Sequence, residues 1–245
     1  MKFFDLVNIS ERTMELVNPS SPEKIIKLGK VLGMGEGSRV IDFGCGFAEP
    51  LVLWAQKFGI TGIGIDVREY ACGRARKKIA AAGLENRIEI VCGNAAEYEF
   101  AVQGFDTATC IGASFIWGGF RPAIHAMRRA IRPGGRLGIG EPYWCHDRVP
   151  ITYAQQEQGV HREQDLLRIA REEGFDFAYV IRASHDDWDR YESDNWDGLL
   201  RWLAENPDHP ERAEVQAHLH KIQEEYLTYG REYLGWAMYA LAQKQ

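Results

Sequence analysis

Two glycines stand close together directly after the first predicted strand. The segment Val-Ile-Asp-Phe-Gly-Cys-Gly, residues 40–46, runs from an apolar stretch through Asp42 to Gly44 and Gly46. Glycines between a strand and a helix let the backbone approach a ligand that faces the helix amino terminus. The third glycine of a dinucleotide fingerprint would fall at Glu49, and a carboxylate is poorly suited to contact a pyrophosphate. The turn therefore favours a ligand with an ammonium and a sulfonium group.

An acidic residue ends the second predicted strand. Asp66 closes the segment Gly-Ile-Gly-Ile-Asp and follows Asp42 by 24 residues. An acid about 20 residues beyond such a glycine turn hydrogen-bonds ribose hydroxyls. The alternative is that Asp66 caps a helix that starts near Glu69. The surrounding pattern of strand, glycine turn and strand favours ribose binding.

Alternating strands and helices are needed to position these residues. Ser21 and Pro22 predict the start of a first helix, and strands and helices then repeat along the chain. Strands separated by helices indicate right-handed crossovers and a mostly parallel, doubly wound sheet, so the predicted fold class is Rossmann-like α/β. Ligands bind beyond the carboxyl ends of such strands. The predicted ranges are strands at 38–43, 60–66, 87–92, 105–111 and 136–140, and helices at 70–82 and 122–131.

The regular alternation of predicted strands and helices ends after residue 145. A helix at 164–173 and a strand at 177–181 precede a long polar and aromatic stretch, in which Asp208 and Pro210 begin another helix. An uncovered loop of that length would be unusual, so the stretch predicts a helical cap before a last strand at 236–241. The expected organisation is an amino-terminal cap segment and helix at 1–35, a core at 36–183, an inserted cap at 184–232 and the last core strand at 233–245.

Composition argues against several classes of partner. The chain of 245 residues has a formal net charge of -6 and a pI near 5.7, so it lacks the positive field that nucleic acid selects. No apolar run approaches the ~20 residues needed to span a bilayer, and the first residues do not resemble a signal peptide. Five cysteines without a Cys-x-x-Cys pair indicate a reducing compartment. We expect a cytoplasmic monomer or homodimer with no nucleic-acid or membrane partner.

The richest basic run begins just before the helix predicted at 70–82. The helical period places apolar residues toward the sheet, so the simplest interpretation of the basic side chains is a solvated helix face. They are Arg68, Arg74, Arg76, Lys77 and Lys78.

Five motifs in a fixed order resemble those of class I S-adenosylmethionine (SAM)-dependent methyltransferases, in the ubiquinone/menaquinone-methyltransferase-like superfamily. They are the two segments described above, Cys92 to Ala96, Phe105 to Ser114 and Ile131 to Gly135. The resemblance implies a sheet of about seven strands with the last one antiparallel, SAM as cofactor and S-adenosylhomocysteine (SAH) as product. A likeness to an uncharacterised bacterial branch of small-molecule methyltransferases extends over nearly the whole chain, through segments such as Gly140 to Trp144.

The resemblance also implies which residues bind the cofactor. Asp42 and the glycine turn would face the methionine part of SAM, Asp66 would bind the ribose, and Asn94 would lie beside the adenine amino group. Asparagine departs from the aspartate usual in the family, but its amide can accept from N6 and donate to a ring nitrogen. The full set is Asp42, Gly44, Cys45, Gly46, Asp66, Val67, Asn94, Ala95, Ile111 and Gly112.

Segments after the fourth and fifth predicted strands are expected to form the substrate wall. Methyl transfer requires an aligned nucleophile and a dry pocket, so no catalytic triad is needed. If a proton must be removed, the candidate bases are His146, Glu141 and Tyr143. The alternative for His146 is that it is a surface residue in a turn. The alternative for Glu141 is that its carboxyl makes a structural hydrogen bond. The candidate substrate-binding residues are Ser114, Trp117, Tyr143 and Trp144, of which the two tryptophans also fit a packing role.

A metal site and two other functions are disfavoured. The acids near His185, which are Asp186, Asp187 and Asp189, are explained as hydrated side chains, and no metal is predicted. An NAD-dependent short-chain oxidoreductase would need a Tyr-x-x-x-Lys pair, which the sequence lacks. Enzymes that methylate bases or amide nitrogens resemble one another in an Asn/Asp-Pro-Pro-aromatic tetrad, and residues 111–114 instead read Ile-Gly-Ala-Ser. A protein that binds SAM without turnover stays open as an alternative.

Overall fold

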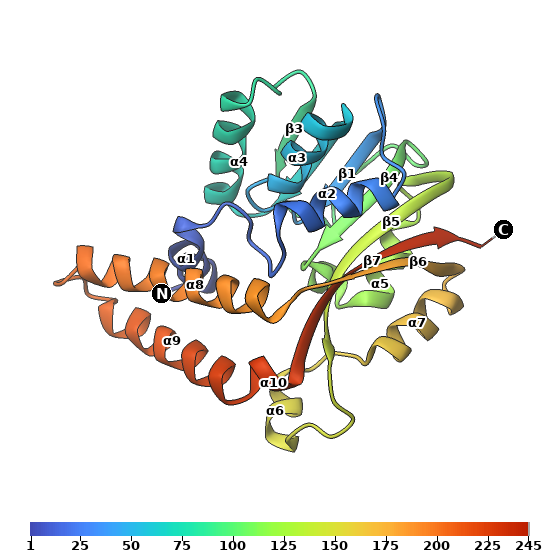
Figure 1. The fold of residues 1–245 in the computed structure, drawn as a ribbon. Coiled ribbons are helices and arrows are strands. Elements are labelled where there is room, and N and C mark those ends of the chain that lie inside the picture. Colours follow the sequence, from blue (N-terminus) through green and yellow to red (C-terminus); the bar gives the residue numbers. More distant parts are fainter. Residues whose placement is uncertain (245) are drawn as a thin grey trace.

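A seven-stranded sheet forms the centre of the computed structural model, which describes residues 1–244 (Figure 1). The strand order is β3-β2-β1-β4-β5-β7-β6, and all neighbours are parallel except β7, which is antiparallel to β5 and β6. The order reverses between β1 and β4, which is where such sheets bind ligands. The strands are β1 (Arg39–Phe43), β2 (Thr61–Asp66), β3 (Ile88–Cys92), β4 (Phe105–Ile111), β5 (Ile131–Trp144), β6 (Phe175–Arg182) and β7 (Leu234–Gln243).

Helices cover both faces of this sheet. One face packs against α2 (Pro22–Val31), α3 (Glu49–Phe58) and α4 (Glu69–Ala81) through a buried cluster that includes Trp54. The other face packs against α5 (Phe120–Met127) and α7 (Glu163–Glu172) through a second cluster that includes Ile124. Burial of large apolar side chains on both faces is the main stabilising contribution to such a three-layer fold.

The remaining helices gather beside the carboxyl ends of the parallel strands. They include α1, which lies next to α8 in Figure 1. Gly198 of α8 allows this close approach, because a Cβ there would lie 2.2 Å from the carbonyl oxygen of Ser10. The elements are α1 (Phe3–Ser10), a 3-10 turn (Glu11–Thr13), α6 (Ile151–Gln156), α8 (His185–Glu205), α9 (Arg212–Glu225), a π-helix (Tyr226–Gly230) and α10 (Arg231–Tyr233).

The predicted fold class is confirmed, including the antiparallel last strand. Two boundaries were wrong. The helix predicted at 122–131 ends at Met127, because Ile131 already pairs with Phe105 as the start of β5. The strand predicted at 136–140 runs from Ile131 to Trp144, because its second half pairs with β7. The helices α1 and α6 were not predicted. The division into four segments stays a prediction, and the end of the segment 233–245 lies outside the described residues. No helix in the described part of the chain combines the length and apolar character that crossing a bilayer requires.

Candidate cofactor and substrate site

The turn after β1 has a backbone shape that requires glycine. Gly44 and Gly46 have φ angles of 71° and 55°, in the left-handed region that side chains disfavour. A Cβ on Gly44 would lie 2.5 Å from the Cβ of Ala113, so substitution would also cause a clash. The amides of Gly44 and Cys45 donate to the carbonyl of Ile65, at 2.8 and 3.0 Å. The turn is therefore fixed against the end of β2.

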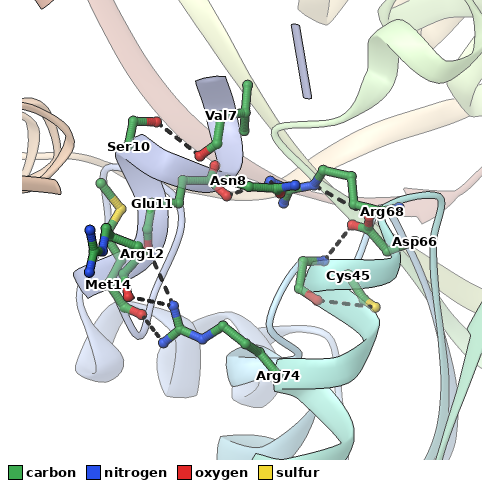
Figure 2. Close-up of polar contacts among 11 residues, drawn as sticks. Val7, Asn8, Ser10, Glu11, Arg12, Met14, Cys45, Asp66, Arg68 and Arg74 are labelled. Atoms are coloured by element: carbon green, nitrogen blue, oxygen red, sulfur yellow. Dashed lines mark hydrogen bonds and ion pairs between the residues drawn. The ribbon is translucent and has the colours of Figure 1, made fainter. Parts of the chain in front are cut away.

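Asp66 connects the two loops that follow β1 and β2. Its Oδ2 accepts a hydrogen bond from the Gly46 amide at 2.9 Å, and its Oδ1 accepts one from the Arg68 amide at 2.9 Å (Figure 2). Asp66 is buried at the end of its strand. Its carboxylate therefore holds a fixed position at the carboxyl edge of the sheet, where the sequence predicted a ribose contact.

Arg68 joins Asp66 to the amino-terminal segment. Its Nη1 donates to Oε2 of Glu11 at 2.6 Å, and its Nε lies 3.5 Å from Oδ1 of Asp66. Arg74 of α4 donates to the carbonyls of Arg12 and Met14 at 2.9 and 2.8 Å, so Arg74 and the N-cap residue Arg68 together hold this segment (Figure 2). The prediction of a solvated face was wrong for Arg68, Arg74 and Lys78, whose side chains are only 9%, 23% and 17% exposed, because the sequence did not predict where the amino-terminal segment packs.

Asp42 is a buried carboxyl beneath the glycine turn. The hydroxyl of Thr109 donates to its Oδ1 at 2.7 Å. Burial raises the pKa of Asp42 to about 7, and the negative charge of Asp66 adds to the rise, whereas the Thr109 hydrogen bond opposes it. A cationic group bound nearby would favour the ionised form of Asp42.

A cavity of about 460 Å³ opens at the carboxyl ends of β1, β2 and β4, and is called the central cavity below. Its size is typical of a ligand site. Eight of the ten predicted cofactor-binding residues line it: Gly44, Gly46, Asp66, Val67, Asn94, Ala95, Ile111 and Gly112. The other two, Asp42 and Cys45, line an adjoining pocket of about 20 Å³ that shares Gly44 and Ile111. The structure thus brings all ten together, and their individual contacts with a cofactor stay a prediction.

The predicted substrate and catalytic residues do not line the central cavity within the described chain. Ser114 is buried next to Phe115, which does line the cavity, and its side chain faces the Glu141 carboxyl. Burial raises the pKa of Glu141 to about 7, against the effect of Ser114. Oε1 of Glu141 has no hydrogen-bond partner among residues 1–244. Trp117 packs against Phe43, with ring centroids 5.2 Å apart.

The remaining three predicted residues lie further along β5 and beyond it. Burial raises the pKa of Tyr143 to about 12. Trp144 packs edge-on against Tyr153, with 5.7 Å between ring centroids. His146 is exposed beside Tyr233 and lines a separate cavity of about 520 Å³ with His185. The structure therefore separates these residues from the predicted cofactor residues.

The acids near the start of α8 have structural partners. Asp187 exchanges hydrogen bonds with Ser184 in a capping box and pairs with Lys24. Asp189 accepts hydrogen bonds from Tyr226 at 2.6 Å and from Arg231 at 2.9 Å. These contacts explain the cluster of charges as helix capping and attachment of the cap.

Several residues that line the central cavity were not predicted individually. They come from α1, the segment 11–17, the N-cap of α4, the 3-10 helix Ser114–Trp117 and α8. The sequence pattern indicated only that the amino-terminal region and the cap would close over the site. Helix α1 is too short for its hydrophobic periodicity to predict where it packs. Its two adjacent phenylalanines, Phe3 and Phe4, are the signal in the sequence that could have indicated a binding surface. The residues are Phe3, Phe4, Val7, Glu11, Val17, Arg68, Phe115, Ile116 and Tyr191.

Comparison with known proteins identifies the class. The family described as Methyltransferase domain matches residues 40–135. The chain is 37% identical over 243 residues to the uncharacterized protein YjhP of Escherichia coli strain K12, which covers 96% of this chain and 97% of that protein. A crystal structure of a SAM-dependent methyltransferase from Thiobacillus denitrificans, in complex with SAH, has a TM-score of 0.92 and 34% identity and covers 100% of both chains. The chain belongs to the SAM-dependent methyltransferase family.

A second solved structure leads to the same class. The SAM-dependent methyltransferase of Geobacter sulfurreducens, also in complex with SAH, has a TM-score of 0.92 and 34% identity and covers 98% of each chain. The protein is accordingly a methyltransferase with SAM as its cofactor. The NAD-dependent oxidoreductase alternative is excluded by this assignment.

Proposed function

We propose that this enzyme transfers the methyl group of SAM to an O, N, S or C atom of a small molecule by direct in-line displacement. The observation that supports this proposal is the central cavity, where eight predicted cofactor residues meet residues of α1, the 3-10 helix and the cap. A single cavity lined in this way has room to hold a cofactor beside an acceptor.

The residues at the strand ends fit the chemistry of SAM. In our proposal the Asp66 carboxylate binds the ribose hydroxyls, and the Asn94 amide binds the adenine edge. Asp42 and the positive-φ turn from Gly44 to Gly46 receive the methionine part, whose ammonium complements the buried carboxyl. When bound, SAM supplies a methyl group on a cationic sulfur that is already activated for displacement.

The covering elements exclude water and align the acceptor. Residues of α1 and Tyr191 of α8 line the cavity together with the strand ends, so in our proposal they cover whatever binds there. Excluding water strengthens the electrostatic contacts inside such a site, and alignment lowers the barrier to displacement. Burial raises the pKa of Tyr191 above its ordinary value of 10, so its hydroxyl stays protonated over an even wider pH range.

Three residues are proposed as candidate proton acceptors: Glu141, Tyr143 and His146. Glu141 is the most favourable of them, because its pKa of about 7 matches the range in which a general base works well. Its neighbour Ser114 precedes Phe115 of the cavity wall, so a small shift of the 3-10 helix would open a path to the carboxyl. Substrate contacts of Trp117, Tyr143 and Trp144 require a similar rearrangement.

The acceptor and cellular setting are part of the proposal. A net charge of -6 and a cavity of about 460 Å³ favour a small molecule over a nucleic acid. Three of the five cysteines, Cys45, Cys72 and Cys110, are buried thiols, which fits a reducing compartment such as the cytoplasm. A monomer or homodimer is compatible with this function.

Two measurements test the proposed function. SAM and SAH should each raise the melting temperature, because a ligand of the native state stabilises it by mass action. Incubation with methyl-labelled SAM and a small-molecule extract should yield SAH and a labelled small product. Melting shifts without any SAH formation would instead favour the alternative of a SAM-binding protein without turnover, and no shift with millimolar SAM or SAH would contradict the site.

A further inference from the structure

Exposed aromatic side chains gather at the central cavity. Phe3, Phe4 and Phe115 are 69%, 44% and 71% exposed, and all three line it. With Val67 they make four of the ten large apolar side chains that are exposed in the described chain. Scattered exposed apolar residues are ordinary, whereas a contiguous patch in a concave site indicates binding.

The apolar lining that the amino-terminal segment and the 3-10 helix Ser114–Trp117 contribute to the cavity is called the apolar wall below. It consists of Phe3, Phe4, Val7, Val17, Phe115 and Ile116. The apolar wall meets the glycine turn directly: Cδ1 of Ile116 lies 3.3 Å, and Cγ2 of Val17 2.7 Å, from where Cβ atoms of Gly44 and Gly46 would stand. A molecule on the apolar wall would therefore lie against the turn that is proposed to hold the methionine part of SAM.

The charged groups of the cavity are already paired with one another. Arg68 is the cation among the described residues that line it, and its guanidinium contacts Glu11 at 2.6 Å and Asp66 at 3.5 Å. Asn8 accepts a further hydrogen bond from Arg68 at 3.4 Å. A phosphate or carboxylate on an acceptor would have to compete with these partners for Arg68. An ammonium would enter next to a cationic cofactor, which repels it.

We propose that the methyl acceptor is a neutral small molecule with an apolar body that binds against the apolar wall, between α1 and the 3-10 helix Ser114–Trp117. This inference rests on the proposed function, since it assigns to the acceptor the part of the central cavity that SAM is not proposed to occupy. Continuity of the apolar wall with the glycine turn favours a small acceptor over a second copy of the chain. The apolar body supplies affinity by leaving water, and its nucleophilic atom faces the turn.

Binding of 4-n-alkylphenols tests the proposal by calorimetry. The holoprotein saturated with SAH is titrated with phenols of increasing chain length, from 4-methyl to 4-hexyl. We expect affinity to rise with each methylene, by up to about fourfold, because each buried methylene leaves water. A 4-hexylbenzoate, which carries a charge on the same body, should bind at least tenfold more weakly.

Matched variants locate the binding. Phe115→Ser and Phe4→Ser should each weaken 4-hexylphenol binding about fivefold or more and leave SAH affinity within twofold, whereas Phe115→Leu should restore most of the loss. Leu200→Ser, at a half-exposed position of α8 that does not line the central cavity, is the control and should change neither affinity. Melting temperatures identify any variant that fails to fold.

Each other outcome overturns the inference. An affinity independent of chain length, or tighter binding of 4-hexylbenzoate, would show that the acceptor class is wrong while SAH binding keeps the proposed function intact. Self-association of the wild type that Phe115→Ser abolishes, without any change in phenol binding, would assign the patch to a second copy. Failure to bind SAH would instead remove the proposed function and the inference together.

Discussion

The two walls of the central cavity are built in different ways. The strand-end wall comes from turns that directly follow β1, β2 and β4, and sheet pairing sets its geometry, as in the bonds from Gly44 and Cys45 to Ile65. The apolar wall comes from α1, Val17 and the 3-10 helix Ser114–Trp117, so it joins segments that lie far apart in the sequence. The amino-terminal segment is held by polar contacts with Arg68 and Arg74. The strand-end wall, called the cofactor wall below, is therefore expected to be rigid. The apolar wall, called the acceptor wall below, is expected to be adjustable.

The strongest test of the rigid wall is Gly44→Ala. The new methyl group would lie 2.5 Å from the Cβ of Ala113 in a residue with φ of 71°. A left-handed conformation costs about 1 to 2 kcal/mol and overpacking about 1 to 3 kcal/mol. We expect the free energy of unfolding to fall by roughly 2 to 4 kcal/mol in urea denaturation.

Gly112→Ala is the matched control for this substitution. Gly112 has φ of 84°, but apart from its own chain neighbours a Cβ there would have no heavy atom of the described residues within 4 Å. Only the backbone cost of about 1 to 2 kcal/mol should remain. Equal losses for the two variants would show that the contact between Gly44 and Ala113 is not restrictive.

Asp66→Ala tests whether the carboxylate belongs to the cofactor wall. We expect SAM and SAH to bind more weakly by roughly 1 to 3 kcal/mol, because a buried hydrogen-bond partner is lost. Asp106→Ala is the control: its Oδ2 accepts a hydrogen bond from the Arg39 amide at 2.7 Å at the opposite edge of the sheet. Calorimetric titration with SAH measures both, and unchanged affinity in folded Asp66→Ala would remove this residue from the site.

The same contrast explains what could be predicted from the sequence. The ten cofactor residues meet because strand order and register bring the ends of β1, β2 and β4 together, and those elements have clear periodicity. The apolar wall depends on where α1 settles, which is decided by long-range contacts such as Gly198 with Ser10 and Arg68 with Glu11. Local sequence patterns do not encode such contacts. For the same reason, the sequence pattern placed Arg68 on a solvated helix face.

The buried carboxyls Asp42 and Glu141 should each make the free energy of unfolding depend on pH. Burial raises both pKa values to about 7, from ordinary values of 3.8 and 4.5. The native state therefore holds the proton more tightly than the unfolded chain. Stability from this source is complete below the ordinary pKa and is lost as pH rises toward about 7.

Asp42→Asn and Glu141→Gln should each remove this loss. As pH rises from 5.5 to 8, the free energy of unfolding of the wild type should fall by roughly 1 to 2 kcal/mol more than that of either variant. Only Asp42→Asn should weaken SAH binding, because Asp42 adjoins the cofactor wall whereas Glu141 lies beneath the 3-10 helix. Urea denaturation and calorimetry at the two pH values test this, and a parallel pH dependence of wild type and variants would contradict the raised pKa values.

The smallest expected effect concerns the attachment of the acceptor wall, tested by Glu11→Gln. The carboxylate of Glu11 pairs with Arg68, and both side chains are only 9% exposed, so its loss should favour opening of residues 3–14 by about 1 kcal/mol. Hydrogen exchange there should be roughly fivefold faster and should slow when SAH binds, because a covering segment closes over ligand. Glu205→Gln removes the more exposed pair with Arg12 and should have little effect. Exchange that is equal with and without SAH would show that this segment is not a lid, and the acceptor wall would then be as rigid as the cofactor wall.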